Sequence, residues 1–307
     1  MRVLVIAGAL ATLIEHSDTT LAIADELTMR GHEVRMCTPT ELTAHGGRLV
    51  AGGTDASGFD AVLVRVDPPV DATFLHMTQL LELLPPDTVI VNEPAGLRRA
   101  NEKLFALEFE ELIPETLVSA SPPQLRRFVD AVGGAAVVKP LDACGGRGVV
   151  HVRAHDPGLP AVPELLTQEG ARLVMAQRLL SAAAAGDKRI FLLDGQPVGA
   201  LLRVPGHTDP RGNLHCGARP ALTTLTASDH RICRVVGKRC QDEGLRFVGI
   251  DVIGSHLTEV NVTSPTGFRE LAAAGGRRLE RAFCDWLELA RAQIPQIEPT
   301  DREEVVS

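Results

Sequence analysis

The sequence predicts an α/β fold in two parts: an N-terminal domain built on a mostly parallel sheet, and an α+β module built on antiparallel strands. Three observations support this prediction. Apolar, β-branched segments alternate with amphipathic helical segments up to about residue 95. From about residue 115, strand segments instead follow one another through glycine-rich turns. The length of 307 residues suits about two domains with sizeable apolar cores.

In the first part, each expected strand is rich in β-branched residues and is bounded by turn formers. Strands are expected at residues 2–7, 33–38, 59–66 and 88–91, and helices at residues 17–30 and 71–84. Ser17 or Asp18 is the expected cap of the first helix, with Gly31 beyond its end, and Asp71 caps the second. No GxGxxG follows the first strand, which argues against a dinucleotide fingerprint.

In the second part, the turn Asp194-Gly195 is typical of an antiparallel hairpin. Strands are expected at residues 116–118, 135–139, 172–177, 189–193 and 198–204, and helices at residues 122–131, 228–243 and 277–292. Ser228 is the expected cap of its helix, and residues 205–219, rich in Gly and Pro, are expected to form a mobile loop. The expected boundaries are 1–95 for the first domain, 96–114 for a connecting helix, 115–180 and 181–293 for two subdomains, and 294–307 for a flexible tail.

The composition narrows the class of protein. A net charge of −8 and a pI near 5.7 argue against a general nucleic-acid binder or a membrane-surface protein. The sequence has no apolar run long enough to span a bilayer, and its start reads as a strand rather than a signal peptide. Six cysteines without a CxxC pair suit reduced thiols, so a cytoplasmic protein is expected.

A predicted hairpin at residues 246–262 carries three polar residues among apolar ones. Glu259 and Asn261 are two residues apart and therefore share a face of their strand. If the turn Gly254-Ser255-His256 has three residues, Asp251 lies directly across from Glu259. Two carboxylates and an amide oxygen that converge need a cation between them, and such hard ligands suit Mg²⁺. An ordinary solvated strand face is the alternative.

Two lysines are candidates for binding phosphate. Lys139 ends a strand shortly before the glycine-rich turn at residues 145–148, whose backbone N–H groups could wrap an anion. The spacing is not a Walker A motif, and a plain β-hairpin with a glycine turn is the alternative. Lys103 lies in a helix-like segment, where a solvent-facing lysine is the ordinary interpretation.

Gln177 and Leu179 leave a strand where backbone groups commonly meet an adenine edge, although an ordinary loop explains them equally well. Four arginines form a further set: Arg189, Arg203, Arg211 and Arg219. Arg189 and Arg203 interrupt or end apolar strands, where an unpaired guanidinium is costly. The planar guanidinium fits carboxylates and phosphates, and individual surface salt bridges are the alternative.

The order of motifs resembles that of the bacterial glutathione synthetase family, which belongs to the ATP-grasp superfamily. The motifs are NEKL, VVKPLDACGG, MAQ, GDKR, the R-V-P…RGNL loop, VGIDVIG and LTEVNVTSPTGFRE. The resemblance extends from about residue 67 to residue 270 and weakens before residue 60. TEVNVTSPT together with DKR and RGNL is specific to this branch, whereas a lysine, a glycine loop and an E-x-N pair are general to ATP-grasp ligases.

The resemblance implies that ATP lies between two antiparallel sheets. It assigns Lys103, Lys139, Gly145, Gly146, Gln177, Leu179 and Arg219 to the nucleotide. It assigns Asp251, Glu259 and Asn261 to two Mg²⁺ ions, with Mn²⁺ as an alternative. It places Arg65, Asp67, Arg203, Ser264 and Thr266 on the substrate side, and Arg189, Arg211 and Asn213 in catalysis.

The implied reaction is an ATP-dependent ligation. A carboxylate of γ-glutamylcysteine attacks the γ-phosphate of ATP, and the amine of glycine then attacks the acylphosphate. A lid at residues 205–219 would exclude water. The alternatives are an ATP-grasp ligase that acts on another peptide or amino acid, and a nucleotide-binding regulator without catalysis. The resemblance also implies a homotetramer with small-molecule substrates.

The sequence departs from the family pattern at three places. Cys144 stands where the family more often has methionine, and Arg147 adds positive charge where a small residue is usual. SPTGF replaces a more usual SPT followed by Cys or Ile, and the segment between Gly46 and Gly58 is compressed. These departures affect the expected substrate more than the expected class of reaction.

Overall fold

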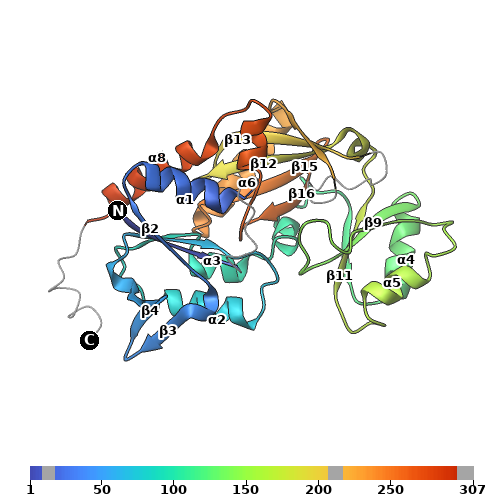
Figure 1. Ribbon diagram of the computed structural model, residues 1–307. Helices are drawn as coiled ribbons and strands as arrows, with labels where there is room; N and C mark the ends of the chain where they lie inside the picture. The colour runs from blue at the N-terminus through green and yellow to red at the C-terminus, as the bar shows by residue number, and fades with distance from the viewer. Residues whose placement is uncertain (9–17, 207–216, 296–307) are drawn as a thin grey trace.

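The computed structural model describes residues 1–8, 18–206 and 217–295 (Figure 1). Its N-terminal part contains a four-stranded sheet of order β2-β1-β6-β7, in which all neighbouring strands are parallel. The strands are β1 (Arg2–Ala7), β2 (Glu33–Cys37), β6 (Ala61–Arg65) and β7 (Val89–Val91). Helix α1 (Thr19–Met29) links β1 to β2, and α2 (Ala72–Leu81) links β6 to β7. The predicted parallel α/β architecture is therefore confirmed.

The caps of these helices follow from their side chains. The Asp18 carboxylate accepts hydrogen bonds from the backbone N–H groups of Thr20 at 2.6 Å and Leu21 at 3.2 Å, so Asp18 is the cap of α1. The alternative cap, Ser17, lies outside the described residues. Asp71 caps α2 as predicted, by accepting from the backbone N–H of Phe74 at 2.9 Å.

A small antiparallel sheet between β2 and β6 was not predicted from the sequence. It has the order β3-β4-β5, with β3 (Leu42–His45), β4 (Arg48–Ala51) and β5 (Thr54–Asp55). Each turn is a Gly-Gly pair with positive φ, Gly46-Gly47 and Gly52-Gly53. Two glycines with positive φ suit a two-residue hairpin turn, so these dipeptides were the available signal.

The segment that joins the two parts is less regular than the expected connecting helix at residues 96–114. It contains the short helix α3 (Pro94–Arg99) and the 3₁₀ helix η4 (Leu104–Phe109). Its carbonyl groups at Glu102 and Leu112 accept hydrogen bonds from Val260 N at 2.9 Å and Leu257 N at 2.8 Å. The connecting segment therefore lies along the edge of the five-stranded sheet described below, which leaves fewer backbone donors unpaired.

The middle of the chain forms a separate antiparallel sheet of order β10-β9-β11-β8, coloured green in Figure 1. The strands are β8 (Thr116–Ser119), β9 (Ala135–Pro140), β10 (Val150–Arg153) and β11 (Val174–Arg178). Helices α4 (Pro122–Ala131) and α5 (Ala161–Leu166) pack on it, and α5 was not predicted. Leu125, Val129, Val138 and Val174 belong to a core that serves this sheet alone.

The third region is a five-stranded antiparallel sheet of order β14-β13-β12-β15-β16. The strands are β12 (Asp187–Leu193), β13 (Gln196–Val204), β14 (Arg219–Leu222), β15 (Phe247–Ile253) and β16 (His256–Asn261). The helices are α6 (Ala227–Asp242), α7 (Phe268–Ala273) and α8 (Leu279–Gln293). The two antiparallel sheets that the resemblance implied are thus both present.

Two expectations in this region were wrong. The cap of α6 is Thr226 rather than Ser228, because the Thr226 hydroxyl accepts from Asp229 N while the Asp229 carboxylate accepts from Thr226 N. Arg219 does not belong to the predicted loop at 205–219 but begins β14, where it pairs with Val204. Residues 207–216 of that loop and residues 296–307 of the predicted tail lie outside the described part of the chain.

Helices α1 and α8 lie side by side on one flank of the molecule (Figure 1). Arg30, just after α1, bonds Asp285 of α8 at 2.7 Å. One apolar core passes from the parallel sheet into the five-stranded sheet, through residues such as Val62, Leu97 and Val260. Across the described residues, no helix combines the length and apolar character needed to cross a membrane.

Candidate active site

A cleft opens between the two antiparallel sheets. Strands β9 and β11 line it on one side, and β12, β15 and β16 on the other. The connecting segment closes one end. Its lining includes many of the residues expected at the nucleotide and metal: Lys103, Lys139, Gly145, Gly146, Gln177, Leu179, Asp251 and Glu259. The fold therefore brings together residues that are far apart in the sequence.

The hairpin of β15 and β16 has the predicted pairing, although its turn differs. Asp251 lies directly across from Glu259, as a three-residue turn would require. The turn itself is shorter, and the register shifts between Asp251 and Val252, so that Thr258 is an extra residue on β16. This β-bulge restores the predicted pairing of Asp251 with Glu259. The backbone carbonyl of Thr258 accepts a hydrogen bond from Lys139 Nζ at 3.2 Å.

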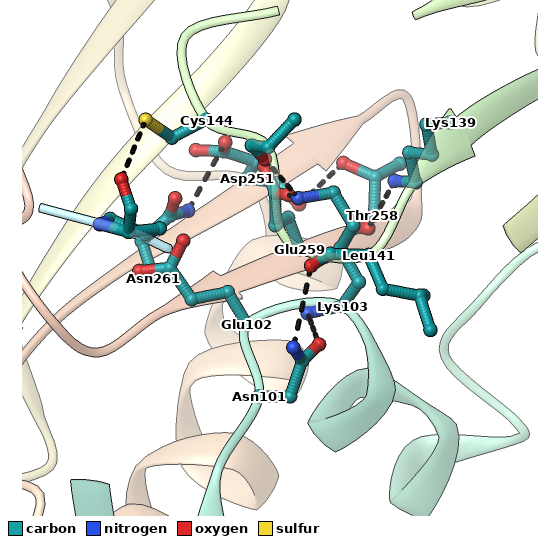
Figure 2. Close-up of polar contacts among 12 residues, drawn as sticks. Asn101, Glu102, Lys103, Lys139, Leu141, Cys144, Asp251, Thr258, Glu259 and Asn261 are labelled. Carbon is teal, nitrogen blue, oxygen red and sulfur yellow. Dashed lines mark hydrogen bonds and ion pairs between the residues drawn. The ribbon is translucent and has the colours of Figure 1, made fainter. Parts of the chain in front are cut away.

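The three predicted metal ligands share one face of the hairpin (Figure 2). The Asn261 side-chain Nδ2 donates to Gly249 O at 3.1 Å and to Asp251 Oδ2 at 3.3 Å. The side-chain oxygen of Asn261 takes part in neither of these two bonds. Glu259 accepts from Lys103 Nζ at 2.9 Å. Asp251 is paired with Arg189, at 2.5 Å and 3.0 Å in a two-point contact, and with Arg203 at 3.0 Å.

The charges on this face shift the ionisation of the carboxylate and the two lysines. Burial opposes the charged form of Asp251, but Arg189 and then Arg203 outweigh it and hold the Asp251 pKa well below its usual range. Burial likewise opposes the charged form of Lys103, yet Glu259 raises the Lys103 pKa above its ordinary value. Lys139 differs, because burial lowers its pKa despite the nearby Glu259.

The residues just before the glycine-rich turn contact the connecting segment. Lys103 Nζ donates to Ala143 O at 2.6 Å, and Asn101 Nδ2 donates to Leu141 O at 3.3 Å (Figure 2). The Asn101 side chain also accepts from the backbone N–H groups of Lys103 and Leu104, at 3.1 Å and 3.0 Å, and so fixes the start of η4. Lys103 therefore joins the residues before the turn to Glu259, which lies on the opposite side of the cleft.

At the other end of the cleft, β11 ends in Gln177 and Arg178. Gln177 is buried, and its side-chain amide donates to Thr116 Oγ1 at 3.1 Å. Leu179 follows the strand and lines the cleft, while its backbone N–H bonds Ala135 O at 3.1 Å. This combination of apolar wall and strand-exit backbone suits a flat heterocycle.

The partly buried Asp187 and the buried Arg203 form a second ion pair beside Asp251. Asp187 lies across from Arg203 in the β12–β13 pairing, and Arg189 lies across from Asp251 in the β12–β15 pairing. Asp187 also bonds Arg203 directly and lines the cleft. Burial raises the Asp187 pKa to about 6, although Arg203 opposes the shift. Among the described atoms, Asp187 Oδ1 and Arg203 Nε are buried without a hydrogen-bond partner.

Gly249 explains how Arg189 reaches Asp251. A Cβ at residue 249 would lie 2.9 Å from Arg189 Cδ and 3.0 Å from Pro265 Cβ. Both contacts are shorter than real Cβ atoms comfortably allow. The glycine of the VGID motif therefore leaves room for the guanidinium to cross the strand.

The segment after β16, Thr263–Gly267, is called the substrate loop because Ser264 and Thr266 were expected to face the substrate. Arg65 from β6 donates to Pro265 O at 2.9 Å, and Arg189 donates to Thr266 O at 3.3 Å. The loop therefore lies where the N-terminal domain meets the five-stranded sheet. Arg65 is 4% exposed, and within the described part of the chain its Nη1 has no partner. Burial lowers the Arg65 pKa to about 10, so the guanidinium stays charged near neutrality.

The remaining predicted residues are more distant or lie outside the described residues. Ser264 and Thr266 are partly exposed in the substrate loop, and Asp67 is exposed just after β6. Arg219 lines a neighbouring hollow with His151 and Leu179 rather than the cleft itself. Arg211 and Asn213, both expected in catalysis, fall in the part of the chain that is not described.

Sequence reasoning missed Glu102, Asp187 and Asn92. Glu102 is 7% exposed and accepts from Thr263 Oγ1 at 2.8 Å. Asn92 donates to Phe247 O at 2.8 Å and to Val262 O at 2.6 Å, where β15 and β16 separate. Glu102 directly precedes Lys103, and Asp187 lies in the GDKR motif together with Arg189. Their closeness to these predicted site residues was the signal that could have identified them.

In the described ranges, no group of three or more His, Cys, Asp and Glu side chains is placed to hold a metal ion. Mg²⁺ does not require such a group, because it is usually bound by one or two carboxylates together with waters and substrate phosphates. Asp251 and Glu259, with the Asn261 amide, match that donor set. The described cysteines, Cys37, Cys144, Cys233, Cys240 and Cys284, are free thiols.

Two family profiles match the chain. The ATP-grasp domain of prokaryotic glutathione synthetase matches residues 102–276, and the N-terminal domain of the same family matches residues 1–57 and 52–98. A glutathione synthetase of Gloeobacter violaceus is 43% identical over 94% of this chain and 96% of the relative. A glutathione synthetase of Brucella melitensis is 39% identical over 95% of this chain and 99% of the relative.

Solved structures share the fold at lower identity. The D-cycloserine synthetase DcsG has a TM-score of 0.70 at 15% identity, covering 93% of this chain and 99% of that one. The ATP-grasp ligase PsnB, complexed with a minimal precursor, Mg and ADP, has a TM-score of 0.68 at 19% identity, covering 95% and 98%. These likenesses establish the ATP-grasp fold and carry no conclusion about substrate.

Proposed function

This chain belongs to the prokaryotic glutathione synthetase family, and we propose that it joins γ-L-glutamyl-L-cysteine to glycine. It is an ATP-dependent ligase that forms a C–N bond, with release of ADP and phosphate. The observation that carries the proposal is the Lys103–Glu259 pair beside Asp251, in a cleft between two sheets. Action on another peptide is not favoured, because the full-length relatives are glutathione synthetases and the ligase solved with its precursor shares only the fold.

ATP is proposed to occupy the cleft with its base at the β11 exit. Gln177 and Leu179 would contact the adenine, since they line that end of the cleft. Gly145 and Gly146 line the other end, where the backbone N–H groups of the turn can face phosphate oxygens. Lys139 would approach the same phosphates from β9. Arg219 would contribute only from the neighbouring hollow.

Asp251, Glu259 and Asn261 are proposed to hold Mg²⁺, as two ions, with Mn²⁺ able to substitute. When bound, Mg²⁺ would neutralise charge on the phosphates during transfer. The hard oxygen donors and their shared face support this assignment. Lys103 keeps Glu259 in place beside the cleft, and Arg189 and Arg203 keep Asp251 ionised.

Catalysis in this proposal rests on neutralising charge and excluding water. Lys103 and Lys139 would face the transferring phosphoryl group while a substrate carboxylate attacks it. Arg189 would stabilise the oxyanion that forms when the amine attacks the acylphosphate. Its guanidinium is already held by Asp251 and Thr266 O, which reduces the reorganisation required during reaction.

The peptide substrate is proposed to lie against the substrate loop. Arg65 supports this location, because its buried Nη1 has no partner among the described residues and could meet a carboxylate. Asp67, Arg203, Ser264 and Thr266 complete the proposed substrate side. Arg211 and Asn213 are proposed to act from the loop that closes over the reaction.

Three further features are proposals on the strength of the family. The enzyme is proposed to be a homotetramer, to act on small molecules without nucleic-acid or membrane partners, and to work in the cytoplasm. The domain boundaries are proposed as 1–95, 96–114, 115–180, 181–293 and 294–307. Separate sheets in the first, third and fourth segments support that division.

The function is tested by measuring ADP release with pairs of carboxylate and amine substrates. We expect release with γ-glutamylcysteine plus glycine, and little release when either is omitted. Other dipeptides and amino acids serve as controls. Release with a different pair alone would contradict the assigned substrates, and no release with any pair would contradict ligase activity.

A further inference from the structure

The dipeptide Glu102-Lys103 contacts β16 and the start of the substrate loop at three points. Lys103 Nζ bonds Glu259 Oε1 at 2.9 Å, and Glu102 O accepts from Val260 N at 2.9 Å. The Glu102 carboxylate then reaches Thr263, the first residue of the substrate loop. Its Oε1 accepts from Thr263 Oγ1 at 2.8 Å and from Thr263 N at 3.4 Å. One short segment therefore sets both the metal-side strand and the start of the loop.

Burying the polar contact between Glu102 and Thr263 has a desolvation cost that an apolar contact would not have. Glu102 is 7% exposed and Thr263 is 2% exposed. Within the described residues, Glu102 has no salt bridge, so its buried charge depends on two hydrogen bonds from Thr263 and on the more distant Lys103. An apolar pair of similar volume would serve packing alone at lower cost. The polar pair is therefore better explained by a requirement for fixed geometry.

The rest of the substrate loop is held by other segments. Arg65 and Arg189 donate to the carbonyls of Pro265 and Thr266. Thr19 Oγ1, at the start of α1, accepts from Gly267 N at 3.0 Å. Glu102 provides the side-chain contact at the entrance, next to Ser264. Loss of Glu102 should therefore increase the freedom of Thr263 at the start of the loop, while Gly267 at its end stays hydrogen-bonded to Thr19.

We propose that Glu102 is a positioning residue for the peptide substrate, which acts by holding Thr263 and so fixing the substrate loop relative to Lys103 and Glu259. The inference rests on the proposed function, because the loop is assigned to the substrate there. Glu102 itself is not proposed to touch the reacting atoms. Its removal should weaken binding of the peptide substrate more than binding of ATP.

Three variants test this role in the full-length enzyme. Glu102→Ala removes the acceptor, and Thr263→Val removes the hydroxyl donor at almost constant volume. Glu102→Gln keeps a carbonyl oxygen that can accept both bonds and removes only the charge. We expect the Ala and Val variants to raise KM for γ-glutamylcysteine about tenfold, with KM for ATP within about twofold, because each loses a buried hydrogen bond between residue 102 and residue 263. Glu102→Gln should retain a KM close to that of the parent.

A double variant separates positioning from simple destabilisation. If Glu102 acts through Thr263, Glu102→Ala combined with Thr263→Val should be no worse than the more severe single change. Effects that multiply would overturn the inference. So would KM values that do not move, or losses of kcat that only follow the folded fraction measured by circular dichroism.

Thr78→Val is the matched control. Thr78 is fully buried in α2 and donates to Leu75 O at 2.7 Å, so the variant loses a buried hydroxyl away from the cleft. It should lower stability without changing either KM. The parent enzyme is assayed first: no activity with γ-glutamylcysteine and glycine would contradict the proposed function, whereas an active parent with unaffected variants would contradict only the role of Glu102.

Discussion

Lys103 and Glu259 form a nearly buried ion pair, 2.9 Å between Nζ and Oε1, that joins the connecting segment to the strand carrying the proposed metal ligands. The same ammonium donates to Ala143 O, just before the glycine-rich turn. Lys103 therefore links three elements around one cleft. This arrangement makes Glu259 the most informative position to change.

Glu259→Gln should lower kcat at least about 100-fold while leaving the fold intact, because it removes a negative charge that the Mg²⁺ site requires. Turnover is measured by ADP release at saturating substrates, and folding by circular dichroism. Glu111→Gln is the control, since its carboxylate lies in the same connecting segment but is 86% exposed. Near-normal turnover in Glu259→Gln would remove Glu259 from the site.

Arg189→Lys should slow ligation about 100-fold and leave ATP affinity within about threefold. Lysine keeps the charge but cannot reproduce the two-point contact with Asp251 or the accompanying bond to Thr266 O. ATP affinity is measured by calorimetry and ligation by single-turnover kinetics. Loss of ATP affinity with an unchanged rate of ligation would show that the proposed role is wrong.

Gly249→Ala should lower kcat about tenfold through its effect on Arg189. The added Cβ would meet Arg189 Cδ at 2.9 Å and Pro265 Cβ at 3.0 Å, so the guanidinium and the substrate loop must shift. Gly158→Ala is the control for replacing glycine, because Gly158, like Gly249, has no positive φ and no atom lies within 4 Å of its added Cβ. Equal turnover in Gly249→Ala and the parent would show that the close approach is not needed for activity.

The raised pKa of Glu102 predicts how the free energy of unfolding changes with pH. Burial, and second the charge of Glu259, raise the Glu102 pKa from 4.5 to about 7. The folded state binds this proton more tightly than the unfolded chain, so the stability contributed by the protonated group is complete below about pH 4.5 and is lost as the pH rises through about 7. Glu102→Gln removes the titration.

The free energy of unfolding of Glu102→Gln should therefore rise relative to the parent between about pH 5 and about pH 8, by no more than about 3 kcal/mol. Urea denaturation across that range measures the difference. Glu111→Gln again serves as the control, for replacing an exposed carboxylate of the same segment. A difference that stays constant with pH would contradict a raised pKa for Glu102.

The hairpin shows what the sequence could predict and what it could not. The two-residue period of a strand placed Glu259 and Asn261 on one face, and the structure agrees. The turn was read as three residues, whereas the structure reaches the same pairing through a bulge at Thr258. A bulge depends on contacts such as the one with Lys139, which no local pattern reveals.

Contacts between distant segments were the least predictable features. The bond from Arg65 to Pro265 O spans 200 positions and that between Glu102 and Thr263 spans 161, so neither follows from local periodicity. The resemblance supplied Arg65 as a substrate residue but not its partner. It assigned no role to Glu102, although this residue lies in the NEKL motif, and the contact with Thr263 is visible only when the connecting segment is seen beside β16.

The central claim, that a phosphoryl group from ATP activates the peptide carboxylate, is tested by isotope transfer. γ-Glutamylcysteine labelled with ¹⁸O in its cysteinyl carboxylate is turned over with ATP, Mg²⁺ and glycine, and the phosphate released is analysed by mass spectrometry. Because the attacking carboxylate oxygen stays on phosphorus when the amine displaces the phosphate, the account predicts one labelled oxygen in each phosphate. Phosphate without label, formed in step with the ligated product, would contradict it.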